Sequence, residues 1–173
     1  MTVKDADTLK SYFILGNVPS PSNYIDLIDT MFAQSQPGGI SYTPAWSSSG
    51  TPPSLGNGTI LGRYHIHGKL CTVFIHLVPG DTTTFGTGNY NFSLPYTARN
   101  ASQHYYGHLH LRYTANSNYE RVAIILAGDS TISLFTAIDP EGNNLNYWTP
   151  ISPVTLGNNF TAQIQITYEL PDG

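Results

Sequence analysis

Charged side chains are scarce in this chain. They make up 10% of its 173 residues, against roughly 25% in an ordinary soluble domain. The formal net charge is −4, and the seven lysine and arginine residues are scattered along the sequence. A nucleic-acid interface needs clustered basic side chains that neutralise phosphates. We therefore predict that the protein does not bind nucleic acid.

Cysteine and long apolar runs are also missing. The single cysteine, Cys71, excludes an internal disulfide framework. No apolar run approaches the roughly 20 residues that a membrane-spanning helix needs, so we expect no membrane insertion. The N-terminal stretch TVKDADTLK lacks the apolar segment of a signal peptide. These absences predict synthesis in a reducing cytoplasm.

Two helical patterns occupy residues 5–33. The stretch DADTLKSYFILG offers Asp7 as the N-cap of a first helix and Gly16 as its stop. The stretch SPSNYIDLIDTMF offers Ser20 as the N-cap of a second helix, with Pro21 at the first helical position. The sequence therefore predicts two short helices at the N-terminus.

Both predicted helices carry apolar stripes at helical spacing. The stripe residues are Leu9, Tyr12 and Phe13 in the first helix and Ile25, Ile28, Met31 and Phe32 in the second. Isolated helices of this length are marginal in water, and two of them cannot cover both stripes. The stripes therefore need another surface, which could belong to the rest of the chain, to sister copies or to a different protein.

The chain from Ser41 onward has the pattern of an all-β domain. Apolar and polar residues alternate in KLCTVFIHL and in FTAQIQITYEL, which predicts one buried and one solvated face for each strand. Turn signals separate further predicted strands at 43–48, 59–66, 89–94, 104–113, 120–127 and 131–138. We predict a helical segment and linker over 1–40, followed over 41–173 by an antiparallel, jelly-roll-like β-sandwich.

Two His-x-His pairs lie within predicted strands. His65 and His67 form the first pair, and His108 and His110 form the second. Residues two apart on a strand point the same way, so the four imidazoles could bind a transition metal if the two strands were neighbours. The pattern is similar to the start of the cupin metal motif, but neither pair has the glutamate that follows in cupins. We predict no metal and no other cofactor.

The outward face of the second histidine strand is a candidate ligand surface. In HYYGHLHLRY the alternation directs Tyr106, His108, His110 and Arg112 away from the core. Trp148 is a further aromatic residue that could stack on a sugar ring. We predict that these five residues face a ligand, with a solvated or subunit-facing surface as the alternative.

The sequence offers little support for catalysis. Hydrolysis of a glycoside needs two carboxylates across the sugar, and no predicted strand centre supplies one. No G-x-S-x-G motif occurs, and Cys71 falls within a core-facing alternation. We predict that the protein is not an enzyme.

Two long stretches resemble bacteriophage and prophage virion proteins. The first, SYTPAWSSSGTPPSLGNGTILGRYHIHGKLCTVFIHLVPGDTTTFGTGNYNFSLP, resembles a segment of tail-fibre and related appendage proteins. The second, LKSYFILGNVPSPSNYIDLIDTMF, is similar to an N-terminal segment of such proteins, LKxYFxTGDxPTxxxFxDLIDS. Together they cover roughly the first 95 residues.

This resemblance implies a short homotrimeric appendage on the virion surface, made in the cytoplasm of the host. The seven stripe residues would form its docking and trimerisation surface, and the β domain would attach to the host surface. Implied partners are sister copies, phage structural proteins of the tail or capsid, and a host cell-surface glycan. The alternatives are a capsid decoration or head-fibre protein, a free carbohydrate-binding module and a metal-dependent enzyme.

Overall fold

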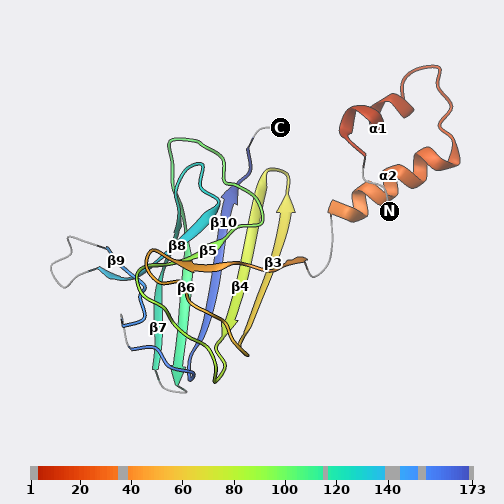
Figure 1. Cartoon of the computed structure of the whole chain (residues 1–173). Helices are drawn as coiled ribbons and strands as arrows, with labels where there is room; N and C mark the ends of the chain where they lie inside the picture. The colour runs from red at the N-terminus through yellow and green to blue at the C-terminus, as the bar shows by residue number, and fades with distance from the viewer. Residues whose placement is uncertain (1–3, 35–38, 115–116, 139–144, 152–154, 172–173) are drawn as a thin grey trace. The chain divides into compact units, whose positions relative to one another are not determined.

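The computed structural model describes residues 4–34, 39–114, 117–138, 145–151 and 155–171. The chain divides into two compact units, Met1–Gly39 and Ile40–Gly173 (Figure 1). The first unit holds helices α1 (Ala6–Tyr12) and α2 (Pro21–Gln34), and the second holds all the strands. This division lies one residue from the domain boundary predicted from the linker.

Helix α1 begins two residues earlier than the sequence predicted. Its N-cap is Asp5, whose carboxylate accepts hydrogen bonds from the backbone N–H of Thr8 at 2.8 Å and from the Thr8 hydroxyl at 2.7 Å. The backbone hydrogen bond from Thr8 also lowers the pKa of the Asp5 carboxyl. The prediction of Asp7 as N-cap was wrong, because Asp5 satisfies an orphan N–H of the first turn and leaves Asp7 inside the helix.

Helix α2 begins as predicted. The Ser20 hydroxyl accepts from the backbone N–H of Asn23 at 3.3 Å, and the Asn23 side-chain oxygen accepts from the backbone N–H of Ser20 at 2.8 Å. These two reciprocal hydrogen bonds have the arrangement of a capping box. Pro21 occupies the first helical position, where the N–H that proline lacks would have no helical partner.

All strands of the second unit belong to one antiparallel sheet. The strands are β1 (Ile40–Tyr42), β2 (Trp46–Ser48), β3 (Thr59–His67), β4 (Leu70–Val78), β5 (Tyr90–Ser93), β6 (Tyr105–Thr114), β7 (Ser117–Ile125), β8 (Thr131–Ile138), β9 (Leu145–Tyr147) and β10 (Thr161–Glu169). Their spatial order is β1-β3-β4-β10-β6-β7-β8-β5-β2, and β9 pairs with β8. The predicted mainly antiparallel β fold, preceded by two short helices, is confirmed.

The sheet curls back on itself, so that its inward face encloses the core. The edge strands β1 and β2 lie at opposite ends of the strand order, yet only residues 43–45 separate them in the chain. Three linking residues span at most roughly 14 Å, so the two edges must be close together. Ser93 of β5 joins them: its hydroxyl accepts from Ala45 N–H at 2.8 Å, and its carbonyl accepts from the Tyr42 hydroxyl at 3.3 Å. The two layers of the predicted sandwich are therefore parts of one continuous sheet.

The predicted alternation places the core correctly. The inward residues of β4 and β10 are at most 2% exposed: Cys71, Val73, Ile75, Leu77, Ala162, Ile164, Ile166 and Tyr168. The predicted strand 43–48 is instead interrupted: only 46–48 forms a strand, and the buried Pro44, which has no N–H for a ladder, precedes it. The short strand β9 escaped prediction, because three residues carry no readable period.

Aromatic rings fill the end of the core near the edge strand β2. Trp148 is fully buried, with its ring centroid 4.9 Å from that of Tyr90 and 5.9 Å from that of Phe160. Trp46 stacks on Phe92 at 6.3 Å. Among the described residues, the buried Nε1 of Trp46 has no hydrogen-bond partner. These contacts join β2 and β5 to the start of β10.

The buried tyrosines predict loss of stability at high pH. Burial raises the pKa of Tyr90, and burial together with the hydrogen bond to Cys71 raises the pKa of Tyr168. Because the folded state holds these phenolic protons more tightly than the unfolded state, their contribution is complete below about pH 10 and is lost as the pH rises above it. An alkaline titration followed by tyrosinate absorbance should therefore show a late phase that coincides with unfolding.

Three variants test the assignment of this late phase. Tyr90→Phe and Tyr168→Phe should each reduce its amplitude, whereas Tyr106→Phe, which removes the hydroxyl of a 66% exposed side chain, should leave it at full size. A late phase of unchanged amplitude in both buried-site variants would contradict the assignment.

Candidate functional site

All six histidines of the chain belong to one side of the sheet. His65 and His67 lie on β3, His76 lies on β4, His104 directly precedes β6, and His108 and His110 lie on β6, and none of them is buried. The strands β3, β4, β10 and β6 are neighbours in this order. We call the outward side of these four strands the histidine face.

The strand register brings outward side chains into two rows across the histidine face. In one row, Leu61 pairs with His76, His76 with Gln163, and Gln163 with His110. In the next row, Arg63 pairs with Phe74, Phe74 with Gln165, and Gln165 with His108. Directly opposed residues of neighbouring strands have side chains close enough to act together.

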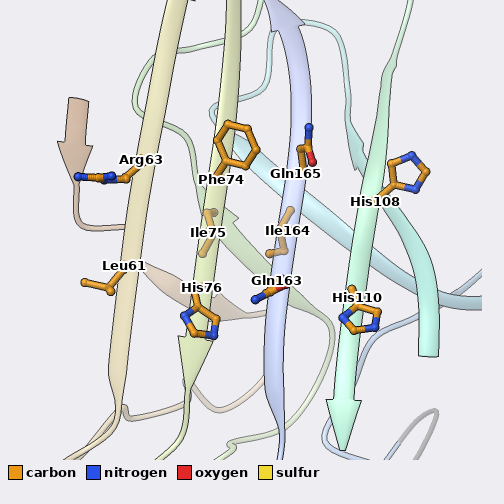
Figure 2. A pocket seen from close by; sticks show the side chains of 10 residues that line it. All are labelled: Leu61, Arg63, Phe74, Ile75, His76, His108, His110, Gln163, Ile164 and Gln165. Carbon is orange, nitrogen blue, oxygen red and sulfur yellow. The ribbon is translucent and has the colours of Figure 1, made fainter. Parts of the chain in front are cut away.

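These two rows line an open groove with a volume of about 580 Å³. Figure 2 shows Leu61 and Arg63 at the β3 side, with His108 and His110 at the β6 side. Between them lie Phe74 and His76 of β4 and Gln163 and Gln165 of β10, above the backbone of Ile75 and Ile164. The groove is thus built from four strands that are far apart in the sequence.

The chemistry of the groove is that of neutral hydrogen-bonding groups around an apolar patch. Each imidazole can donate and accept when neutral, and each glutamine amide offers two donors and one acceptor oxygen. Arg63 adds a permanent cation, and Leu61 and Phe74 are 64% and 39% exposed. None of the described residues that line the groove carries a carboxylate.

Carboxylates lie beside the groove on the same side of the sheet. Glu120 of β7 is paired with His110 in the register. Glu169, at the end of β10, forms an ion pair with Arg99 at 2.8 Å. The groove lining itself would suit a ligand that forms hydrogen bonds and tolerates the positive charge of Arg63.

The structure separates the five residues predicted to face a ligand. His108 and His110 line the groove. Tyr106 and Arg112 are exposed on the same side of β6 but do not line it. The prediction for Trp148 was wrong, because its side chain is fully buried and packs in the aromatic core.

Leu61 and Arg63 of β3 were not predicted as site residues, and neither were four groove residues of β4 and β10: Phe74, His76, Gln163 and Gln165. The alternation of β4 and β10 did place them on the outward faces of their strands. What the sequence did not contain was the pairing of β10 between β4 and β6, which alone brings these residues next to the histidines of β6.

The two His-x-His pairs do not meet. Strands β4 and β10 lie between β3 and β6, so the pairs are three strand spacings, or roughly 14 Å, apart. A zinc ion needs ligand nitrogens at about 2.0–2.1 Å. No group of three or more His, Cys, Asp or Glu side chains suited to a metal ion occurs within the described residues.

The N-terminal unit forms a second candidate surface. Contacts between α1 and α2 include the Phe13 and Tyr24 rings, 5.7 Å apart, and a 3.1 Å hydrogen bond from the Tyr12 hydroxyl to Asp26. These contacts do not cover the apolar stripe of α2. Ile25, Ile28 and Met31 remain 50–63% exposed.

The other predicted docking residues are also accessible in part. Phe13 is 44% exposed, and Leu9 and Tyr12 are partly buried. Phe32 lies in α2, but its side chain is outside the described part of the structure. No helix in the described residues is long and apolar enough to cross a membrane.

Comparison with known proteins identified a distant relative. The chain is 27% identical over 130 residues to the Mu-like prophage FluMu defective tail fiber protein of Haemophilus influenzae. The match covers 75% of this chain and 20% of the relative, so the chain spans about a fifth of that protein's length. No family model and no solved structure matches the chain.

The separation of the histidine pairs predicts low metal content. Purified without a histidine tag or chelator, the protein should contain less than one equivalent of transition metal per chain by elemental analysis. His65→Ala and His108→Ala should leave that content unchanged, because neither pair has a third ligand within reach. A stoichiometric metal that is lost in either variant would contradict this prediction.

Proposed function

We propose that the chain is a component of a phage virion appendage of the tail-fibre type, with a structural rather than an enzymatic role. Its N-terminal helices associate with sister copies in a homotrimer and dock it to the particle, and its β unit attaches to the host surface. The observation that carries this proposal is the similarity to a prophage tail fiber protein over three quarters of the chain. The division into two units of different surface chemistry supports it.

The helical unit supplies the surface for assembly. Three large apolar side chains of α2, those of Ile25, Ile28 and Met31, are half or more exposed. Burial of such a side chain stabilises a folded or assembled state by roughly 1.5–3 kcal/mol. Contiguous exposed apolar side chains of this kind mark interaction sites, and symmetric self-association with docking on the particle would cover them.

The β unit supplies a part that can be displayed without the helices. Every residue of the hydrophobic core cluster, including the partly buried residues packed against it, lies between Tyr42 and Leu170. No described residue of the helical unit belongs to that core. A domain with its own core can fold alone, so the β unit can project from an anchored segment.

The groove of the histidine face suits binding better than catalysis. Its lining offers imidazoles, amides and one guanidinium but no carboxylate among the described residues, whereas glycoside hydrolysis uses two. The thiol of Cys71 is fully buried, and burial raises its pKa. A buried thiol of raised pKa is a poor nucleophile.

Assembly is tested by removing the helices. Full-length protein should scatter light as three chains, whereas a variant lacking residues 1–38 should remain folded and soluble but no longer join particles. The reason is that the core of the β unit is complete without the helices. A monomeric full-length protein, or a truncated protein that still incorporates normally, would contradict the anchor assignment.

Two charge variants distinguish loss of the apolar interface from unfolding of α2. Ile28→Asp with Met31→Asp should abolish the trimer, because each substitution places a carboxylate in the proposed interface. Ser22→Asp adds one carboxylate in the first turn of α2, before the stripe begins, and should leave the trimer intact. Equal loss in both cases would point to unfolding of α2 instead.

Attachment is tested by competition. If the β unit binds the host surface, an excess of recombinant residues 39–173 should reduce phage adsorption, because it occupies the same receptors. The variant Trp148→Ala, which removes the centre of the aromatic core, serves as an unfolded control and should not compete. Unchanged adsorption, together with infection by phage that lack the protein, would favour a capsid decoration role.

A further inference from the structure

We propose that the groove of the histidine face binds an acidic saccharide, with its sugar hydroxyls on the glutamine amides and imidazoles and its acidic group beside Arg63. This inference deepens the proposed attachment function and rests on it for its biological setting. It makes a separate claim about the chemistry of one site. The occupant is a sugar that carries a carboxylate or a phosphate.

The charge around the groove favours an anion. Six described side chains that can carry positive charge are on or next to the groove: Arg63 and His65 on β3, His76 on β4, and His108, His110 and Arg112 on β6. The carboxylates beside the groove are Glu120, across from His110 on β7, and Glu169, which is ion-paired with Arg99. Arg63 lies on the β3 side of the groove, at the end away from Glu120.

The hydrogen-bonding pattern favours a sugar. Along one row, Gln163 lies between His76 and His110 and presents amide and imidazole groups that both donate and accept (Figure 2). Sugar hydroxyls need partners of this mixed kind, because each is both donor and acceptor. Exposed Leu61, at the β3 end of this row, and exposed Phe74, in the next row, offer an apolar surface for the C–H side of a pyranose ring.

The same features disfavour a nucleic acid. Phosphodiester chains are held by several lysines or arginines at once, and Arg63 is the one such residue among the groove lining that the structure describes. The net charge of −4 adds no long-range attraction for a dense polyanion. A ligand with many hydroxyls and few charges fits this balance.

Calorimetry with matched sugars tests the proposal on the full-length protein. The probes are trigalacturonic acid for a carboxylate, mannose 6-phosphate for a phosphate, and galactotriose as the neutral match to the first. At least one acidic probe should bind at millimolar concentration or below and about tenfold more tightly than galactotriose, because it gains the charge-assisted contact with Arg63. Equal binding of acidic and neutral probes, no binding of either acidic probe, or tighter binding of a single-stranded DNA oligonucleotide would overturn the proposal.

Four variants locate the binding site. Arg63→Gln should lower the affinity for the acidic probe about tenfold and leave any binding of galactotriose unchanged, since it removes one charge-assisted contact. His76→Gln and His110→Gln should each weaken binding of the acidic probe, because each removes an imidazole that lines the groove. His67→Gln is the matched control, because this exposed histidine is on the same side of β3 but does not line the groove. An effect of His67→Gln equal to that of the groove variants would place the anion elsewhere and overturn the proposal.

These results are independent of the role in the virion. Specific binding of the acidic sugar by a protein that is absent from particles would support the groove assignment and reject the tail-fibre role. A protein that blocks adsorption equally well with and without Arg63→Gln and His76→Gln would support attachment and reject the groove as its site.

Discussion

The candidate site depends on the insertion of β10 between β4 and β6. Residues Ala162–Glu169 pair with β4 and Thr161–Gln165 pair with β6, so β10 pairs with two strands that begin 91 and 56 residues earlier in the chain. Its inward side chains fill the core, and its outward glutamines form the middle of the groove. Without this pairing, the histidines of β4 and β6 would have no common neighbour.

The same alternation fixes the core and the groove together. Along β10, Ile164 is buried at 2% exposure while Gln163 and Gln165 on either side of it line the groove. A shift of the register by one residue would exchange the two faces. Gly107 on β6 adds a further constraint, because a Cβ at this position would lie 2.6 Å from the Cβ of Ile166 on β10. The histidines of β6 are thus held next to β10 by a close backbone approach that a larger residue would disturb.

Local sequence patterns predicted which side chains of each long strand face outward. They failed where a side chain's position depends on contacts with residues far away in the sequence. The outward positions of His108 and His110 follow from a period of two, but their neighbours Gln163 and His76 could not be read from it. Trp148 was wrongly assigned to the surface because it directly follows a three-residue strand, where no alternation exists to mark the inward side. Its burial results from Tyr90 and Phe160, which are 58 and 12 residues away in the sequence. Asp5 and Asp7 compete for one helix start, and only the geometry of the first turn distinguishes them.

The two proposed surfaces, the groove of the β unit and the apolar stripe of α2, differ in chemistry and lie in separate units. The groove is open and lined mainly by neutral groups, so a single site exchanges water for similar hydrogen bonds and gains little free energy. Linking such sites raises the overall affinity without any new contact. In the proposed trimer, the apolar stripe of α2 would hold the copies together, while the groove of each β unit would stay open to a ligand. Weak recognition at Gln163 and its histidine neighbours can then serve attachment only if assembly through Ile25, Ile28 and Met31 brings several grooves to one surface.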